Sequence, residues 1–173
     1  MAMEREVKLR VKDREMLLKM LRELGAQPVS RKTQHDHYLD INDDLLRSRG
    51  DSLRVRQEED DCYITFKGKQ LNDELKLREE LETRVENCKV MLEIMNRLGF
   101  AEKITVKKVR ESYKLKGAII EVDLVDGLGD FIEIELRGEM RVEDVRALAG
   151  KLMVEWAPIK DGYADMLLKL RKP

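Results

Sequence analysis

Charged and apolar residues alternate at the start of the chain, over residues 4–11. Alternation with a period of two is the pattern of a half-buried strand, whose successive side chains point to opposite faces. Glu4, Glu6 and Lys8 then share one face, and Val7 and Leu9 share the other. A single charged strand face is typical of a surface in contact with water. Whether this face is functional can therefore be judged only together with the other strands.

Apolar residues recur at helical spacing in four later segments, and each is predicted to be a helix. The first begins after Asp13, a residue type that caps helix starts, and ends at Gly25, a residue type that closes helices. The others span residues 86–98, 141–153 and 161–171, and a turn or short helix is expected at 42–48.

Further strands are predicted between these helices, at residues 34–41, 52–58, 62–68, 75–85, 103–115, 118–125 and 130–137. Residues 75–85 could also form a helix. A strand is preferred there because Arg78, Glu80, Glu82 and Arg84 then share one face.

The order strand, helix, strands occurs twice in the chain, which predicts a weak internal repeat. The first copy runs from Glu4-x-Glu6-x-Lys8 to a helix ending in Leu24-Gly25. The second runs from Glu80-x-Glu82-x-Arg84 to a helix ending in Leu98-Gly99. Leucine–glycine helix ends are common, so chance is the alternative.

Composition limits the class of protein. The 173 residues are expected to form one domain, 1–173, and their net charge of −1 argues against nucleic-acid binding through an excess of basic residues. No apolar run approaches the roughly 18 residues of a membrane span, and the charged N-terminus is unlike a signal peptide. A cytoplasmic protein is therefore expected.

The high content of Lys, Arg and Glu favours a heat-adapted source. Cys62 and Cys88 are expected to be reduced thiols, with a single disulfide as the alternative.

Nearly every predicted strand has one charged and one apolar face, and the amphipathic helices can cover the apolar faces. About eight antiparallel strands can close into a barrel, which removes exposed edges. The predicted fold class is therefore α+β, an eight-stranded antiparallel β-barrel or tunnel with a charged interior and helices packed outside. An open sheet with a solvated charged face is the alternative. Because buried like charges cost several kcal/mol per ion unless neutralised, the pattern favours a receptor for a metal–polyphosphate complex.

Seven motifs resemble, in their order, those of the CYTH domain or triphosphate tunnel metalloenzyme superfamily, over almost the whole chain. They are Glu4-x-Glu6-x-Lys8, Asp36-x-Tyr38-x-Asp40, Leu53-Arg54-x-Arg56, Lys67-Gly68, Arg78-x-Glu80-x-Glu82, Lys108-x-Arg110, and Asp123 followed by the Gly127-Leu128-Gly129 turn and Glu133-x-Glu135. Class IV adenylate cyclases and their archaeal relatives are the most similar subgroup. That subgroup often has Ser-Tyr where this chain has Gly162-Tyr163, so the role of this position is open.

The resemblance implies an eight-stranded antiparallel tunnel and an Mg²⁺- or Mn²⁺-dependent enzyme whose substrate carries a triphosphate, with a homodimer as an expectation. The charge balance and the absence of long apolar runs predict no nucleic-acid and no membrane partner. Carboxylates suit such hard cations, and the predicted metal ligands are Glu4, Glu6, Asp123, Glu133 and Glu135. Cationic side chains bind phosphate oxygens, and the predicted set is Lys8, Arg54, Arg56, Lys67, Arg78, Lys108 and Arg110. Lys8, Glu6 and Arg56 are the predicted catalytic residues, and the roles of Glu80 and Glu82 stay open.

The attacking nucleophile decides the activity. A ribose 3′-hydroxyl at the α-phosphorus of ATP gives cyclic AMP and pyrophosphate, the leading expectation. Water at the terminal phosphorus gives an inorganic triphosphate or thiamine triphosphate hydrolase. A non-catalytic nucleotide- or polyphosphate-binding module is a third hypothesis.

Overall fold

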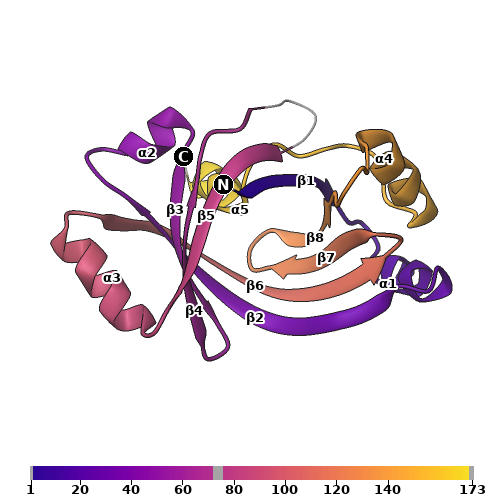
Figure 1. Cartoon of the computed structure of the whole chain (residues 1–173), viewed down its shortest axis with the longest axis horizontal. Coiled ribbons are helices and arrows are strands. Elements are labelled where there is room, and N and C mark those ends of the chain that lie inside the picture. The colour runs from indigo at the N-terminus through magenta and orange to yellow at the C-terminus, as the bar shows by residue number, and fades with distance from the viewer. Residues whose placement is uncertain (1, 72–75, 172–173) are drawn as a thin grey trace.

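The computed structural model describes residues 2–71 and 76–171 (Figure 1). Within these ranges the strands form one closed, fully antiparallel barrel in the order β1-β5-β4-β3-β2-β6-β7-β8. The predicted eight-stranded barrel is thus confirmed. The strands are β1 (Ala2–Arg10), β2 (Gln27–Asp40), β3 (Ser52–Glu58), β4 (Asp61–Lys67), β5 (Lys76–Val85), β6 (Ala101–Leu115), β7 (Ala118–Val125) and β8 (Gly129–Glu135).

Strand β1 closes the barrel because it pairs on both sides. Its first half lies beside β5, where Glu4 is opposite Arg78, and its second half lies beside β8, where Lys8 is opposite Glu133. Antiparallel partners directly opposite each other bring their side chains close on the same face. The register therefore places complementary charges next to each other inside the barrel.

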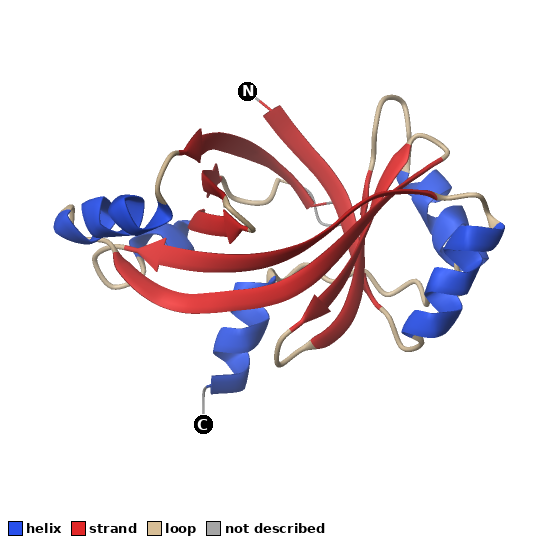
Figure 2. Ribbon diagram, turned by 90° about the horizontal axis from the view of Figure 1, so that it is seen from below, coloured by secondary structure: helices blue, strands red, loops and turns tan. Residues whose placement is uncertain are grey.

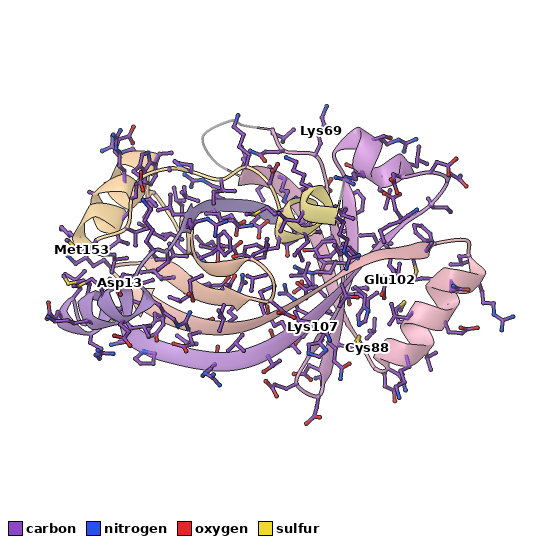
Figure 3. All side chains as sticks on the ribbon, turned by 180° about the vertical axis from the view of Figure 1, so that it is seen from behind. Asp13, Lys69, Cys88, Glu102, Lys107 and Met153 are labelled. Carbon is purple, nitrogen blue, oxygen red and sulfur yellow. A yellow bond between two sulfur atoms is a disulfide. The ribbon has the colours of Figure 1, made fainter. Side chains whose placement is uncertain are left out.

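The five helices of the described ranges lie outside the barrel, and α5, which ends near C in Figure 2, lies along its side between the helices of the two ends. Helices α1 and α4 lie at one end and α2 and α3 at the other, as the positions of Asp13, Met153 and Cys88 in Figure 3 show. The helices are α1 (Arg14–Glu23), α2 (Leu45–Arg49), α3 (Cys88–Arg97), α4 (Val142–Lys151) and α5 (Tyr163–Arg171).

Helices α1 and α4 cover the outer face of one half of the barrel. Val7 and Leu9 on β1 are fully or almost fully buried there against Leu17 and Leu21 of α1 and against Val145 of α4. Helix α3 covers β3 and β4 in the same way, around Val55. Since the apolar strand faces point outward to these helices, the charged faces point inward, as the alternation predicts.

The internal repeat of the sequence is present in the structure. β1-α1-β2 and β5-α3-β6 follow the same order, β1 pairs with β5, and β2 pairs with β6. Both helices have ten residues, begin with a side-chain cap from Asp13 or Asn87, and end at a glycine with positive φ, +77° at Gly25 and +96° at Gly99. Glycine tolerates this left-handed backbone without the steric cost of a Cβ atom.

Strand β2 is longer than predicted. It begins at Gln27 rather than at residue 34, includes Pro28, and pairs with β6 along its length with a register shift after Pro28. The side chains of residues 27–33 are exposed or only partly buried on both faces. No apolar alternation is therefore needed there, and the sequence gives no strand signal.

The expectation of two reduced thiols was wrong. Cys62, at the start of β4, and Cys88, at the start of α3, form a disulfide with a Cα–Cα distance of 5.5 Å. The two residues are 26 positions apart in the chain, and only the antiparallel pairing of β4 with β5 brings them together. Spacing alone could not show this contact.

Among the described residues, no helix is both long enough and apolar enough to cross a membrane.

Candidate active site inside the barrel

The barrel encloses a cavity of about 1150 Å³. Its wall includes all seven predicted phosphate-binding cations, which come from β1, β3, β4, β5 and β6: Lys8, Arg54, Arg56, Lys67, Arg78, Lys108 and Arg110. It also includes four of the five predicted metal ligands, namely Glu4, Glu6, Glu133 and Glu135. The fifth, Asp123, is fully buried and lies behind the wall.

Arg110 is the centre of the most acidic region. Its Nε and Nη2 donate to the two Asp123 carboxylate oxygens at 2.7 and 2.6 Å, and Nη2 also donates to Glu133 at 2.5 Å. Its Nη1 pairs with Glu121. Lys8 approaches Glu133 from the other side at 3.2 Å. The carboxylates of β7 and β8 thus fix the positions of Arg110 and Lys8 in the wall.

Asp36 is the centre of a second buried cluster. Its carboxylate accepts hydrogen bonds from Arg56 Nε and Nη2 at 2.6 and 2.8 Å and from Lys108 Nζ at 2.8 Å. Burial by itself would raise the pKa of Asp36, but Lys108, Arg56 and Arg54 hold it well below its usual range. Asp36 therefore stays ionised and offsets the positive charge of the cations around it.

A third group lies where β1, β4 and β5 meet. Lys67 Nζ donates to both oxygens of Glu4 at 2.7 Å and lies 3.1 Å from Glu80. Arg78 Nε is 3.5 Å from Glu4. These contacts place Glu80, whose role the sequence left open, as a partner of Lys67.

Arg54 is nearly buried, at 8% exposure. It donates to Thr65 at 3.1 Å and to Glu82 at 3.4 Å. Its Nε has no hydrogen-bond partner within the described part of the chain. A buried guanidinium N–H without a partner is costly.

Two cavity groups have pKa values shifted toward neutrality. Burial lowers the pKa of Lys108 to about 8, with Arg56 adding to the shift and Asp36 opposing it. Burial raises the pKa of Glu121 to about 7, with Arg110 opposing the shift and Glu133 and Asp123 adding to it. Strong shifts of this kind are typical of functional sites.

The chain after α4 returns to the cavity. Ile159 N–H donates to the Lys8 carbonyl at 2.9 Å, and Lys8 Nζ donates to the Asp161 carbonyl at 3.3 Å. The ring of Tyr163, the first residue of α5, lies 3.6 Å from Lys8 Nζ. Its hydroxyl donates to Asp123 at 2.7 Å.

Sequence reasoning missed three of these residues as site members. Asp36 was named only as part of the Asp36-x-Tyr38-x-Asp40 motif and not as a site residue. Glu121 shares a strand face with Asp123, which was the signal that could have found it. Tyr163 was noted as part of Gly162-Tyr163 with an open role, and its place beside Lys8 depends on how α5 docks on the barrel.

The carboxylates suit a divalent ion in their chemistry, although no three His, Cys, Asp or Glu side chains of residues 2–71 and 76–171 are already gathered around an ion position. Glu6 and Glu135 are directly opposite each other on β1 and β8. Mg²⁺ usually binds through one or two carboxylates and completes its shell with water and substrate phosphates. The donor set therefore fits an ion that is bound together with a phosphate ligand.

A closed antiparallel barrel with cations and carboxylates on its inner wall defines a class of tunnel-shaped barrel proteins. Comparison with known proteins gives the family: the CYTH domain model matches residues 2–153, and the chain belongs to this family.

Three relatives illustrate the similarity. A Methanocaldococcus jannaschii protein named "Putative adenylate cyclase" is 34% identical over 132 residues, which cover 76% of this chain and 75% of the relative. The structure of the PH1819 protein of Pyrococcus horikoshii has a TM-score of 0.87 at 28% identity and covers 97% of this chain and 99% of that one. A Hippeastrum structure, described as a putative adenylyl cyclase with a dominant triphosphatase activity, has a TM-score of 0.78. Its identity is 17%, it covers 98% of this chain and 97% of that chain, and it shows a common fold.

Proposed function

We propose that this chain is a divalent-metal-dependent enzyme that converts ATP into cyclic AMP and pyrophosphate. One observation carries the proposal: all seven predicted phosphate-binding cations and four of the five predicted metal ligands, from different strands, line the same cavity. A triphosphate needs several fixed cations along its length, and phosphoryl transfer is catalysed mainly by positioning and charge stabilisation. The relative with 34% identity and the name of an adenylate cyclase supports the choice of reaction.

In this proposal different groups of cations bind different parts of the triphosphate. Arg54, Arg56 and Lys108 grip phosphate oxygens around Asp36, and Lys67 and Arg78 do so beside Glu4. The planar guanidinium groups bind two oxygens at once, while the lysines act as point charges. Lys8 and Arg110 lie nearest the acids of β7 and β8 and stabilise charge that develops on the reacting phosphate.

Glu4, Glu6, Glu133 and Glu135 are the proposed ligands of Mg²⁺ or Mn²⁺, and Asp123 supports them through Arg110. Such an ion supplies charge neutralisation at the phosphate oxygens. Lys8, Glu6 and Arg56 are the proposed catalytic residues. The proposed partner is a small-molecule triphosphate, without nucleic acid or membrane.

Hydrolysis of inorganic or thiamine triphosphate is the second candidate. The same wall of cations would serve it, because only the nucleophile changes from a ribose hydroxyl to water. The Hippeastrum protein of the same fold is described with a dominant triphosphatase activity.

Product analysis tests the proposal. Purified protein with Mg²⁺ or Mn²⁺ is given ATP, inorganic triphosphate and thiamine triphosphate, and the products are separated. Cyclic AMP with pyrophosphate is the expected result for ATP. Orthophosphate in place of cyclic AMP would support the hydrolase, and tight binding without turnover would support a binding module.

A pair of variants links the activity to the cavity. Glu6→Gln removes a carboxylate charge from the wall and should lower turnover about a hundredfold. Glu139→Gln makes the same change at an exposed position outside the cavity and should leave turnover unchanged. Equal activity of the two variants would contradict the assignment of this site.

A further inference from the structure

The chain beyond the family match completes the wall of the cavity. The match ends at residue 153, yet Asp161, Gly162 and Tyr163 all line the cavity. Tyr163 is 5% exposed, and its ring meets Phe131 edge-on at 5.1 Å and 60°. The ring is therefore held in a fixed place by the barrel itself.

The Tyr163 ring contacts two cations from strands that are not neighbours. Lys8 Nζ of β1 lies 3.6 Å from the ring centroid, and Lys108 Nζ of β6 lies 5.5 Å from it. Two strands, β7 and β8, separate β1 from β6 in the barrel. An aromatic face attracts ammonium groups, most strongly where water is excluded. One ring thus holds two like charges near each other.

The Tyr163 hydroxyl reaches a third cation indirectly. It donates to Asp123 Oδ2 at 2.7 Å, and the same carboxylate holds Arg110 through two hydrogen bonds. Ring and hydroxyl together connect Tyr163 to Lys8, Lys108 and Arg110, all of them lining the cavity.

We infer that Tyr163 is a positioning residue, which fixes Lys8 and Lys108 with its ring and Arg110 through Asp123, and so sets how tightly the cavity binds a triphosphate. The inference rests on the proposed function for the identity of the ligand. It extends the site into the C-terminal segment, outside the residues that define the family match.

Two substitutions separate the ring from the hydroxyl. Tyr163→Phe keeps the ring and loses the hydrogen bond to Asp123, while Tyr163→Leu loses both. Tyr113→Phe is the matched control, because the Tyr113 hydroxyl also donates to a carboxylate, Glu111, at 2.8 Å but lies outside the cavity. Titration calorimetry with inorganic triphosphate in the presence of Mg²⁺ measures binding without turnover.

The inference predicts that affinity for inorganic triphosphate is lowest in Tyr163→Leu and close to the natural value in Tyr163→Phe and Tyr113→Phe. Tyr163→Leu should bind inorganic triphosphate about tenfold more weakly than the natural chain. Tyr163→Phe should stay within about threefold of it, since the aromatic contact remains. Tyr113→Phe should bind like the natural chain. Equal losses in Tyr163→Phe and Tyr163→Leu, or no loss in either, would overturn the inference.

A spectroscopic measurement tests the ring contact without ligand. Lysine methylene protons that lie over an aromatic ring are shifted upfield, so protein with ¹³C-labelled lysine should show shifted ε-methylene signals that persist in Tyr163→Phe and vanish in Tyr163→Leu. Absence of shifted signals in the natural chain overturns the inference even if Tyr163→Leu fails to fold.

The two proposals fail in different ways. Triphosphate binding that depends on the Tyr163 ring, without cyclic AMP formation, would reject the cyclase and keep the role of Tyr163. Cyclic AMP formation with unchanged binding in Tyr163→Leu would do the opposite. A natural chain that binds no triphosphate contradicts both.

Discussion

Asp36 shows how single residues prepare this cavity. It is the carboxylate shared by Arg56 and Lys108, it has 0% exposure, and it does not itself line the cavity. Its charge makes the close approach of these cations tolerable in the folded chain. Asp36 therefore both stabilises the fold and positions Arg56 and Lys108 in the cavity wall.

Asp36→Asn should destabilise the fold strongly. The amide keeps the size of the side chain but leaves Arg56 and Lys108 as buried charges without an anion, which typically costs about 3–5 kcal/mol. Urea unfolding measures the loss, and Asp126→Asn on an exposed turn is the control. A free energy of unfolding within about 1 kcal/mol of the natural value would show that the cluster contributes little.

Lys108 predicts a pH dependence of binding. Because its pKa is about 8, the side chain is mostly positive below pH 8 and mostly neutral above it. A neutral lysine no longer attracts phosphate, so affinity for inorganic triphosphate should fall as the pH rises from 7.5 to about 9. Calorimetry across this range measures the slope.

Lys108→Met is the decisive comparison for this slope. It should bind more weakly at pH 7.5 and show a smaller pH dependence, whereas the exposed Lys89→Met should retain both the affinity and the slope. Protonation of the triphosphate itself is common to all three proteins. The same slope in Lys108→Met and in the natural chain would assign the titration to another group.

At the scale of elements, the two halves of the barrel are secured differently. Helix α1 shares its core with α4, whereas α3 covers β3 and β4 with little help from other helices. The disulfide joins the first residue of α3 to β4. Cys88 Sγ also lies 3.6 Å from the carbonyl oxygen of Arg56, on the strand that carries two of the cavity arginines. The disulfide therefore fixes α3 against β3 and β4 in this half of the barrel.

Removing this disulfide should lower stability without abolishing the fold. A closed loop of 26 residues corresponds to about 3.5 kcal/mol of unfolded-state entropy. Thermal unfolding of the natural chain with and without reductant measures the change. The double variant Cys62→Ala/Cys88→Ala should have the lower stability of the reduced chain and should not respond to reductant.

At the scale of the whole molecule, the alternation of charged and apolar residues predicted the two faces of each strand, while the choice of a closed barrel over an open sheet rested also on the resemblance to the CYTH family. The alternation placed Glu4, Glu6 and Lys8 on one face and Val7 and Leu9 on the other, and the structure has them in the cavity and in the outer core. Local rules work here because the side-chain direction in a strand depends only on its neighbours in the sequence.

Contacts between distant segments could not be predicted in this way. The pairing of Cys62 with Cys88 depends on strand order, and the place of Tyr163 beside Lys8 depends on the docking of α5. The start of β2 was missed because its side chains are not buried enough to impose a pattern. Each of these errors concerns a relation in space that leaves no periodic signal.

Ligand binding should stabilise the whole barrel. The cations of the wall repel one another, and a triphosphate with Mg²⁺ would neutralise them in the native state only. At a ligand concentration one hundred times the Kd, the free energy of unfolding should rise by about 2.7 kcal/mol. Thermal unfolding with inorganic triphosphate and Mg²⁺ measures this rise, and sodium chloride of equal ionic strength is the control. An equal effect of both salts would indicate non-specific screening.

The double pairing of β1 has a consequence for synthesis of the chain. β1 is translated before the other strands of the barrel, but its partner residues are 76–80 on β5 and 131–135 on β8. Pairing between residues so far apart is slow and must wait until most of the chain has been made. The strand that carries Glu4, Glu6 and Lys8 is thus the first strand of the barrel to be translated and among the last to be paired. A nascent chain that stops before β8 would lack one of the two partners of β1 and could not close the barrel.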